Sequence, residues 1–209
     1  MEKYRKNLAH PWHGISIGPN PPETVNVYIE LCPQDGIKYE LDKDSGLLRV
    51  DRPQRFSSYA PAPYGMIPKT YCGKNVAKIM GEDIEQPDLA GDKDPLDIMV
   101  LTEKIVPHGD ILMSARPLGG LGLLDRGEAD DKLIAVLQDD AVYGKYKTLS
   151  DLPAGIVTRI KHYFLSYKTG PDAKKPKCTV ETMYEREKAY EIIEASRQDY
   201  ENLISQEVN

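Results

Sequence analysis

The chain has 209 residues, of which 40% are hydrophobic and 29% are charged, and its formal net charge is −6 with a sequence pI near 5.3. This length and composition are ordinary for a globular protein that forms one domain, here expected to span residues 1–209. The acidic balance argues against a protein that binds nucleic acid through bulk electrostatics. We therefore expect no nucleic-acid partner.

Cysteine usage and hydropathy indicate the compartment. Cys32, Cys72 and Cys178 are widely spaced and odd in number, which argues against a disulfide framework and favours a reducing compartment. No apolar run approaches the roughly 18 to 20 residues that span a bilayer, and the first ten residues are polar. We expect a soluble, cytoplasmic protein with no membrane partner.

An irregular arm and three short strands are predicted for residues 1–52. Residues 1–24 are rich in Pro, Gly and His and are expected to form an irregular N-terminal arm. Residues 25–30 alternate and include β-branched side chains, which is typical of a strand. Residues 37–41 and 47–52 are predicted to pair as a hairpin around the glycine-containing loop 42–46.

The middle of the chain is less regular. Residues 53–68 contain four prolines, so they are not expected to form a helix interior or a central strand. Residues 69–91 are polar and mixed and are expected to form a surface excursion. Glycines at 119–122 suggest a bend or bulge. Three further segments are predicted strands: 94–102, 111–116 and 132–137.

Two helices are predicted to close the chain. Ser150–Pro153 offers an N-cap and a proline near the first turn, and apolar residues then follow at helical spacing to Tyr167. A lysine-rich loop at 168–177 leads to a C-terminal helix over 181–209. Short strands without intervening helices predict a mainly β (α+β) fold, a five-stranded OB-like closed antiparallel barrel with two C-terminal helices.

Two acidic clusters stand out. The run Asp92-Lys93-Asp94-Pro95-Leu96-Asp97 crowds three carboxylates, which costs free energy unless cations neutralise them, and Mg²⁺ prefers oxygen ligands. A solvated acidic turn is the alternative. An EF-hand loop is disfavoured because Asp97 stands where that loop needs glycine. The second cluster, Asp125–Lys132, is a charged turn when taken alone; paired in space with the first, it would complete a multi-metal site.

Cationic and aromatic candidates lie elsewhere in the chain. Lys38 and Glu40 share one face of their predicted strand, because side chains two residues apart point the same way, and Arg52 ends the partner strand. Surface ion pairs are the alternative for these three. Tyr167 and Lys168 end the first predicted helix. Instead of belonging to a site, Tyr167 could be part of the apolar stripe, and Lys168 could interact favourably with the helix C-terminus.

In order along the chain, these segments resemble the family I soluble inorganic pyrophosphatases. The run from Asp92 to Asp97 is similar to that family's acidic DxDPxD signature, which an apolar strand follows. The resemblance extends over about residues 25–170. Its further segments are Ile37–Glu40, Asp44–Leu47, Val50–Arg52, Tyr64–Gly65, Asp125, Asp130, Lys132–Val136 and Tyr167–Lys168. A tyrosine that the family often carries four residues before Tyr64 is replaced by Ala60, with Tyr59 beside it.

The resemblance implies an enzyme that hydrolyses pyrophosphate to two phosphates by direct attack of water, with several Mg²⁺ ions in each active site. It implies that the metal ions are bound by Asp92, Asp97, Asp125 and Asp130. It implies that Asp94 orients or deprotonates the attacking water. The phosphates would be bound by Lys38, Arg52, Tyr64, Tyr167 and Lys168, and the site would also be lined by Glu30, Glu40 and Lys132.

Members of this family are oligomers, typically hexamers in bacteria and dimers in fungi, so the resemblance implies a homo-oligomer, with the hexamer favoured over the dimer. The sequence is also compatible with other functions. An OB-like module that binds nucleic acid or a partner protein is the main rival, although acidic clusters would repel a phosphate backbone without metal. A pseudoenzyme and a calcium buffer are weaker alternatives.

Overall fold

The computed structural model describes residues 9–55, 57–170 and 172–207. Its main sheet has seven strands in the order β5-β8-β6-β4-β1-β7-β9, and β7 pairs with β8 as well. These strands are β1 (Val25–Leu31), β4 (Tyr64–Met66), β5 (Ala90–Gly91), β6 (Asp97–Leu101), β7 (Ile111–Asp125), β8 (Glu128–Leu137) and β9 (Cys178–Glu185). A separate two-stranded sheet is the predicted hairpin, β2 (Ile37–Leu41) with β3 (Leu48–Pro53).

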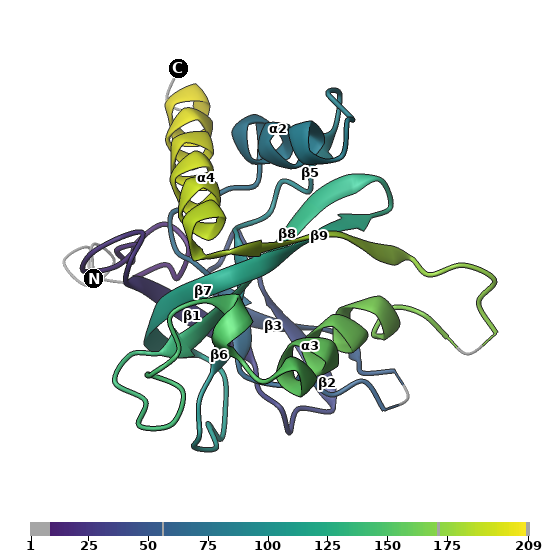
Figure 1. Ribbon diagram of the computed structural model, residues 1–209. Helices are drawn as coiled ribbons and strands as arrows, with labels where there is room; N and C mark the ends of the chain where they lie inside the picture. Colours follow the sequence, from purple (N-terminus) through teal and green to yellow (C-terminus); the bar gives the residue numbers. More distant parts are fainter. Residues whose placement is uncertain (1–8, 56, 171, 208–209) are drawn as a thin grey trace.

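The helices lie at opposite ends of the sheet. Helices α2 (Lys74–Asp83) and α4 (Arg186–Glu207) lie side by side at one end, and α3 (Ala154–Ser166) lies at the other (Figure 1). A short 3-10 helix, Leu149–Asp151, precedes α3. The expectation of a mainly β fold with two helices in the C-terminal part is confirmed. No helix in the described ranges is both long and apolar enough to cross a membrane.

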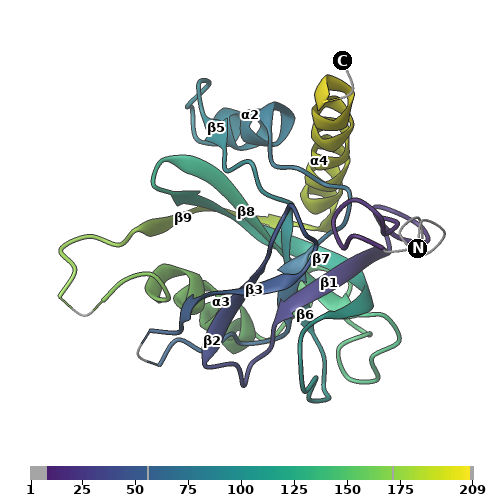
Figure 2. The ribbon, with the colours of Figure 1, turned by 180° about the vertical axis from the view of Figure 1, so that it is seen from behind.

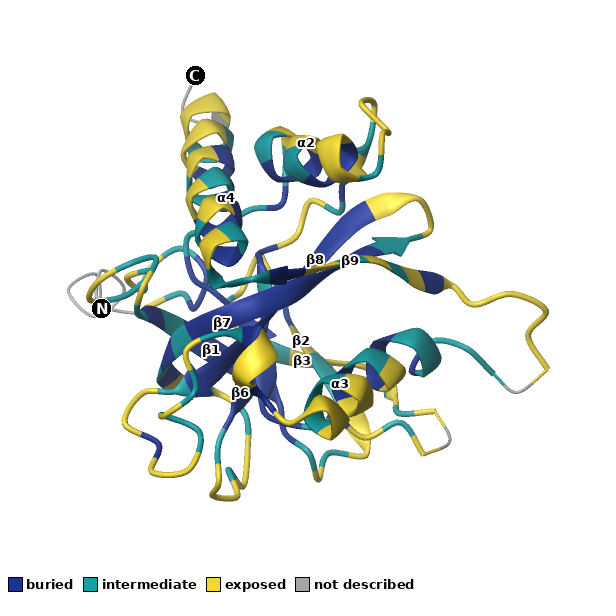
Figure 3. Cartoon of the chain, viewed as in Figure 1, coloured by how far each residue is buried: buried dark blue, intermediate teal, exposed yellow. Residues whose placement is uncertain are grey.

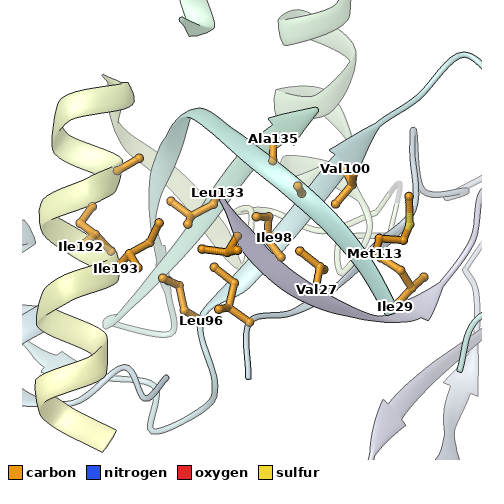
Figure 4. Packing of buried hydrophobic residues seen from close by; sticks show 14 of the residues in the cluster. Val27, Ile29, Leu96, Ile98, Val100, Met113, Leu133, Ala135, Ile192 and Ile193 are labelled. Atoms are coloured by element: carbon orange, nitrogen blue, oxygen red, sulfur yellow. The ribbon is translucent and has the colours of Figure 1, made fainter. Parts of the chain in front are cut away.

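Apolar side chains fill the space between the sheet and these helices. On the α4 side, Ile192 and Ile193 share one cluster with Leu133 and Ile98, and all four are almost fully buried (Figure 4). On the α3 side, Phe164 belongs to a second buried cluster. Strands β7 and β8 are buried along most of their length (Figure 3). Burying one aliphatic side chain contributes about 1.5–3 kcal/mol, so these clusters hold the sheet and helices together.

Strand direction departs from the sequence prediction. The pairings β8–β6, β6–β4, β4–β1, β1–β7 and β7–β8 lead back to the strand they started from. Strand direction alternates in an antiparallel ring, and an odd number of strands cannot alternate all the way round. One pair is therefore parallel, and it is β6 with β8. The expectation of an entirely antiparallel five-stranded arrangement was wrong for this reason.

A helix within the first half of the chain was also missed. Residues 69–91 contain α2, whose Val76, Ala77 and Met80 are buried, and then β5, which pairs in parallel with β8. The helix is only ten residues long and carries four apolar side chains among its polar ones, so its helical pattern is short in sequence. The expectation that no helix separates the strands was therefore wrong.

The N-terminus of α2 is held by a carboxylate from the end of the chain. Asp199 of α4 accepts hydrogen bonds from the amides of Gly73, Asn75 and Val76 at 2.9–3.1 Å. A carboxylate at this position satisfies amides that have no partner within the helix and interacts favourably with the helix dipole. Asp199 is only 5% exposed, so it ties α4 to α2 within a buried contact.

Replacing Asp199 by Ala is expected to lower the free energy of unfolding by about 2–3 kcal/mol, because several amide donors lose a charged acceptor. Urea denaturation measures the change. The control is Glu201→Ala on the same helix, whose carboxylate is 59% exposed and lies 3.9 Å from Arg197. Asp199→Asn, which keeps an acceptor oxygen, is expected to lie between the two. Equal midpoints for Asp199→Ala and Glu201→Ala would contradict the proposed cap.

The proline-rich segment contains a central strand that was not expected. Strand β4 lies between β1 and β6. Its three residues fall between Pro63 and Pro68, so no proline has to donate to the sheet. A Cβ atom at Gly65 would lie 1.9 Å from the carbonyl oxygen of Tyr28, so only glycine allows this close approach of β4 to β1.

Three boundaries also differ from prediction. Strand β7 was expected to end at residue 116 but continues through the glycines at 119–122. The bulge expected there is confirmed, because the register of β7 shifts against β8 between Pro117 and Gly119 and against β9 between Gly122 and Leu123. Strand β8 begins at Glu128, so part of the second acidic cluster lies in a strand. Residues 181–185 extend β9 along β7, and α4 begins after them at Arg186. Pairing with a neighbouring strand, which local sequence does not reveal, overrides the local pattern in each case.

The N-terminal arm is irregular, as expected, over its described part, residues 9–24; residues 1–8 lie outside the described ranges. Trp12 anchors it to the molecule. This side chain is 5% exposed, and its indole nitrogen donates to the carbonyl oxygen of Thr70 at 2.8 Å. The arm therefore packs against the segment that leads into α2.

Candidate active site

A cavity of about 260 Å³ opens between the hairpin β2–β3, the start of β6 and the end of α3. The hairpin lies beside β1 (Figure 2). The volume is below the roughly 300–1,000 Å³ of sites for drug-sized ligands, so the cavity suits a small ligand. The expected site residues that line it are Glu30, Lys38, Glu40, Tyr64, Asp92, Asp94, Asp97, Asp125, Asp130, Lys132, Tyr167 and Lys168.

Arg52 is the expected residue that lies outside this lining. It lines an adjoining hollow that shares Lys38, Glu40 and Lys168 with the first cavity. Its guanidinium group lies 5.9 Å from the centre of the Tyr167 ring. The two hollows are therefore neighbours, and Arg52 stands beside the cavity.

The loop that carries the first acidic cluster is fixed on both sides. The Asp92 amide donates to the carbonyl oxygen of Ala129 on β8, and the Cys72 amide donates to the carbonyl oxygen of Asp94 at 2.8 Å. The Asp94 amide donates to the Asp92 carboxylate at 3.0 Å. Lys93 has a φ of 65°, a left-handed conformation that turns the chain between the two aspartates. This tight loop is why Asp92 and Asp94 line the same cavity.

The parallel pair β6–β8 joins the two acidic clusters. Its register places Asp97 opposite Lys132, and Asp130 lies on the same face of β8 as Lys132. The Lys132 ammonium group, in a side chain that is 4% exposed, bonds to the carboxylates of both Asp97 and Asp130. Two segments more than thirty residues apart in sequence therefore meet at one buried cation.

Asp125 sits at the far end of β7 with a lysine of its own. The Lys168 ammonium group donates to one carboxylate oxygen of Asp125 at 2.5 Å. The Cys178 thiol donates to the other oxygen at 3.3 Å. Strand pairing places Asp125 opposite Cys178 on β9, and Lys168 follows α3, so three elements converge on this carboxylate.

Burial shifts the titration of the pocket carboxylates. Burial raises the pKa of the Asp92 carboxyl to about 9, and the charge of Asp130 adds to the shift. Burial and the charge of Asp97 raise the pKa of Glu30 to about 8, although the Leu41 amide donates to that carboxylate. The pocket thus holds more acidic groups than its lysines neutralise.

The pKa values of the lysines are raised as well, but by neighbouring carboxylates and against the effect of burial. Burial opposes the charge of Lys132, but Asp130 and Asp97 outweigh it and hold the pKa of that ammonium group well above its usual value. The pKa of Lys38 is also raised overall: burial lowers it, but the carboxylates of Glu40 and Asp51 together raise it by more. Both lysines therefore stay charged beside the carboxylates.

The donor set fits hard divalent cations. Asp92, Asp97 and Asp130 offer carboxylate oxygens, the ligands that Mg²⁺ prefers, and crowding three carboxylates favours a bound cation. Among the described residues, no three carboxylate, imidazole or thiol groups are already arranged around one point. Lysine ammonium groups instead lie against Asp94, Asp97 and Asp130. Metal binding here would require some of these carboxylate oxygens to exchange partners.

Lys43 and Glu128 also line the cavity, and sequence reasoning assigned neither. Glu128 lies within the second acidic cluster, which was the available signal. Lys43 lies in the hairpin loop, and only the folded chain shows that this loop reaches the acidic cluster. Tyr59, beside the position where the family often carries tyrosine, is 52% exposed and is not part of this lining, while Ala60 is buried.

Comparisons with known proteins all find similarity to proteins of one description. A family model described as inorganic pyrophosphatase matches residues 27–201. A protein of Chlamydia caviae named inorganic pyrophosphatase is 47% identical over 99% of this chain and 97% of its own length. One of Chlamydia muridarum with the same name is 46% identical over 98% and 100%. The crystal structure of inorganic pyrophosphatase from Thermus thermophilus superposes with a TM-score of 0.75 at 28% identity, covering 92% of this chain and 99% of that one.

Proposed function

This chain belongs to the inorganic pyrophosphatase family, and on that premise we propose that its cavity hydrolyses pyrophosphate with the help of several Mg²⁺ ions and by direct attack of water. Membership makes the chain an inorganic diphosphatase, which cleaves a phosphoanhydride. The observation that carries the proposal is the meeting of both acidic clusters at Lys132. Crowded carboxylates beside lysines suit a site that gathers cations and a small polyanion.

The aspartates of the two clusters are proposed to bind the metal ions: Asp92, Asp97, Asp125 and Asp130. Asp97 begins β6, and its carboxylate interacts electrostatically with Asp92 and Asp130, so these three carboxylates would hold metal ions together. When bound, such ions neutralise phosphate charge and lower the pKa of coordinated water. Asp94 is proposed to orient or deprotonate the attacking water. Its carboxylate is 51% exposed at the cavity, where water can reach it.

The cationic side of the cavity is proposed to bind the phosphates. Ammonium and guanidinium groups are strong donors to phosphate oxygens, and tyrosine hydroxyls add neutral donors. The proposed phosphate-binding residues are Lys38, Arg52, Tyr64, Tyr167 and Lys168. Glu30, Glu40 and Lys132 complete the site. Glu40 pairs with Lys38, and Lys132 holds Asp97 and Asp130, so these residues set the positions of their partners.

Further properties belong to the same proposal. We infer that the closed ring of pairings is the OB-like barrel expected from the sequence and that the chain forms one domain. We also propose a cytoplasmic location, to which three unpaired thiols are suited. A homo-oligomer, with the hexamer favoured over the dimer, would cover exposed side chains such as Ile105, which is 87% exposed. Sedimentation equilibrium distinguishes hexamer from dimer.

Removing metal is expected to abolish activity. Purified protein should release phosphate from pyrophosphate in Mg²⁺, lose this activity in excess EDTA and regain it when Mg²⁺ is restored. Mg²⁺ should also raise the melting temperature, because a ligand that binds only the folded state stabilises it. Undiminished phosphate release in EDTA would refute metal dependence. Binding of single-stranded nucleic acid without phosphate release would instead favour the OB-like binding module.

A further inference from the structure

Lys43 joins the hairpin loop to the first acidic cluster. Its ammonium group forms an ion pair with the Asp94 carboxylate. The two side chains are 45% and 51% exposed, and ion pairs in such surroundings contribute only about 0–1 kcal/mol to stability. The pair therefore adds little to the fold. It does place an ammonium group directly against the Asp94 carboxylate.

The loop that carries Lys43 has a fixed backbone. The Asp42 amide donates to the carbonyl oxygen of Leu47, and the Gly46 amide donates to that of Asp42, both at 2.8 Å. Gly46 has a φ of +72°, and a Cβ atom there would lie 2.8 Å from the His10 ring. The loop is thus a closed turn in close contact with the N-terminal arm.

His10 fixes the backbone of Lys43 itself. The imidazole Nδ1 accepts from the amides of Trp12 and His13, which leaves the proton of a neutral ring on Nε2. Nε2 then donates to the carbonyl oxygen of Lys43 at 2.9 Å. The arm therefore fixes the backbone of the loop and with it the direction in which the Lys43 side chain leaves that backbone.

Trp12 holds the arm against the acidic loop. Its carbonyl oxygen accepts from the Lys69 amide at 2.9 Å, and its indole donates to Thr70 at 2.8 Å. The Thr70 hydroxyl accepts from the amide of Leu96, next to Asp97, at 2.9 Å. The Trp12 ring also lies 5.9 Å from the Lys43 ammonium group. One set of contacts thus places the arm, the lysine and the acidic loop relative to one another.

We propose that Lys43 is a positioning residue for Asp94 and that residues 9–14 of the arm serve catalysis by holding Lys43 in place. The inference rests on the proposed function, since it assigns a partner to the carboxylate that handles the attacking water. The family model begins at residue 27, so the arm lies outside the matched segment.

Lys43→Met is expected to lower kcat about 10- to 100-fold with little change in the KM for pyrophosphate, because a misplaced catalytic group slows the chemical step. Lys43→Arg, which keeps the charge, should restore most of the loss. The matched control is Lys78→Met on α2, which removes the same charge from a side chain that is 73% exposed; its kcat should equal that of the wild type. Melting temperatures of all three variants should agree.

Double-mutant cycles test how Lys43 acts. In an Asp94→Asn background, Lys43→Met should cause no further loss, because the group it positions is gone. His10→Ala should lower kcat in the wild type but not in Lys43→Met. Wild-type kcat in Lys43→Met, a loss confined to KM, or an undiminished loss in the Asp94→Asn background would each overturn the inference. Phosphate release by the wild type tests the proposed function separately, so the two failures are distinguishable.

Discussion

Asp94→Asn is expected to lower kcat by about two to four orders of magnitude while leaving the fold intact. General-base catalysis and water orientation typically contribute 10²–10⁴-fold, and asparagine has the shape of aspartate without its proton-accepting charge. The side chain is half exposed, and its ion pair with Lys43 contributes little to stability, so the melting temperature should change by no more than a few degrees.

The measurement compares kcat and the Mg²⁺ dependence of wild type and variant. Because Asp94 acts on water in our proposal, the variant should still bind Mg²⁺, as seen from a rise in melting temperature on adding the ion. Asp44→Asn in the hairpin loop is the control, since it removes the same charge outside the cavity lining. Turnover near the wild-type value in Asp94→Asn would remove Asp94 from its assigned role.

Lys132→Met is expected to have the largest effect on stability among the pocket residues. The ammonium group lies against two carboxylates in a side chain that is 4% exposed. Removing one partner of a buried ion pair costs about 3–5 kcal/mol, because the remaining charges lose their compensation. The variant should unfold at a clearly lower urea concentration in the absence of divalent ions and should hydrolyse pyrophosphate poorly.

Added Mg²⁺ provides the sharper readout for Lys132. If Asp97 and Asp130 bind metal, the ion should stabilise Lys132→Met more than it stabilises the wild type, because it supplies the missing positive charge. Lys104→Met, which removes a lysine that is 81% exposed, serves as control. Equal stabilisation of Lys132→Met and wild type by Mg²⁺ would argue against metal binding at these two carboxylates.

Local sequence patterns were sufficient for much of the fold. Alternation located β1 and the hairpin, and the proline after Ser150 located α3 to within a few residues. These signals depend only on residues that are close in sequence, so they can be recognised without knowledge of the fold. Helix α2 was missed because its N-terminus is held by Asp199, a residue 126 positions away from Gly73.

The sequence indicated which residues line the site more fully than it indicated how they meet in space. The motif from Asp92 to Asp97 could be singled out because its spacing is local, whereas Asp130 and Lys132 were named through the resemblance to the family. Their meeting depends on a parallel pairing between strands with β7 inserted between them in the chain, which no local pattern encodes. Lys43 was missed for a similar reason, since a loop lysine carries no sequence signal until tertiary contacts place it beside Asp94.

The hydrogen bonds from the first amides of α2 to Asp199 of α4 have a consequence for how the protein folds during synthesis. During synthesis the acidic loop and β8 are made well before Asp199 is added, because α4 follows them in the chain. Until α4 docks, the first amides of α2 can bond only to water. The nascent chain can therefore gather its pocket carboxylates early, but the other end of the sheet is completed only after translation has reached the final helix.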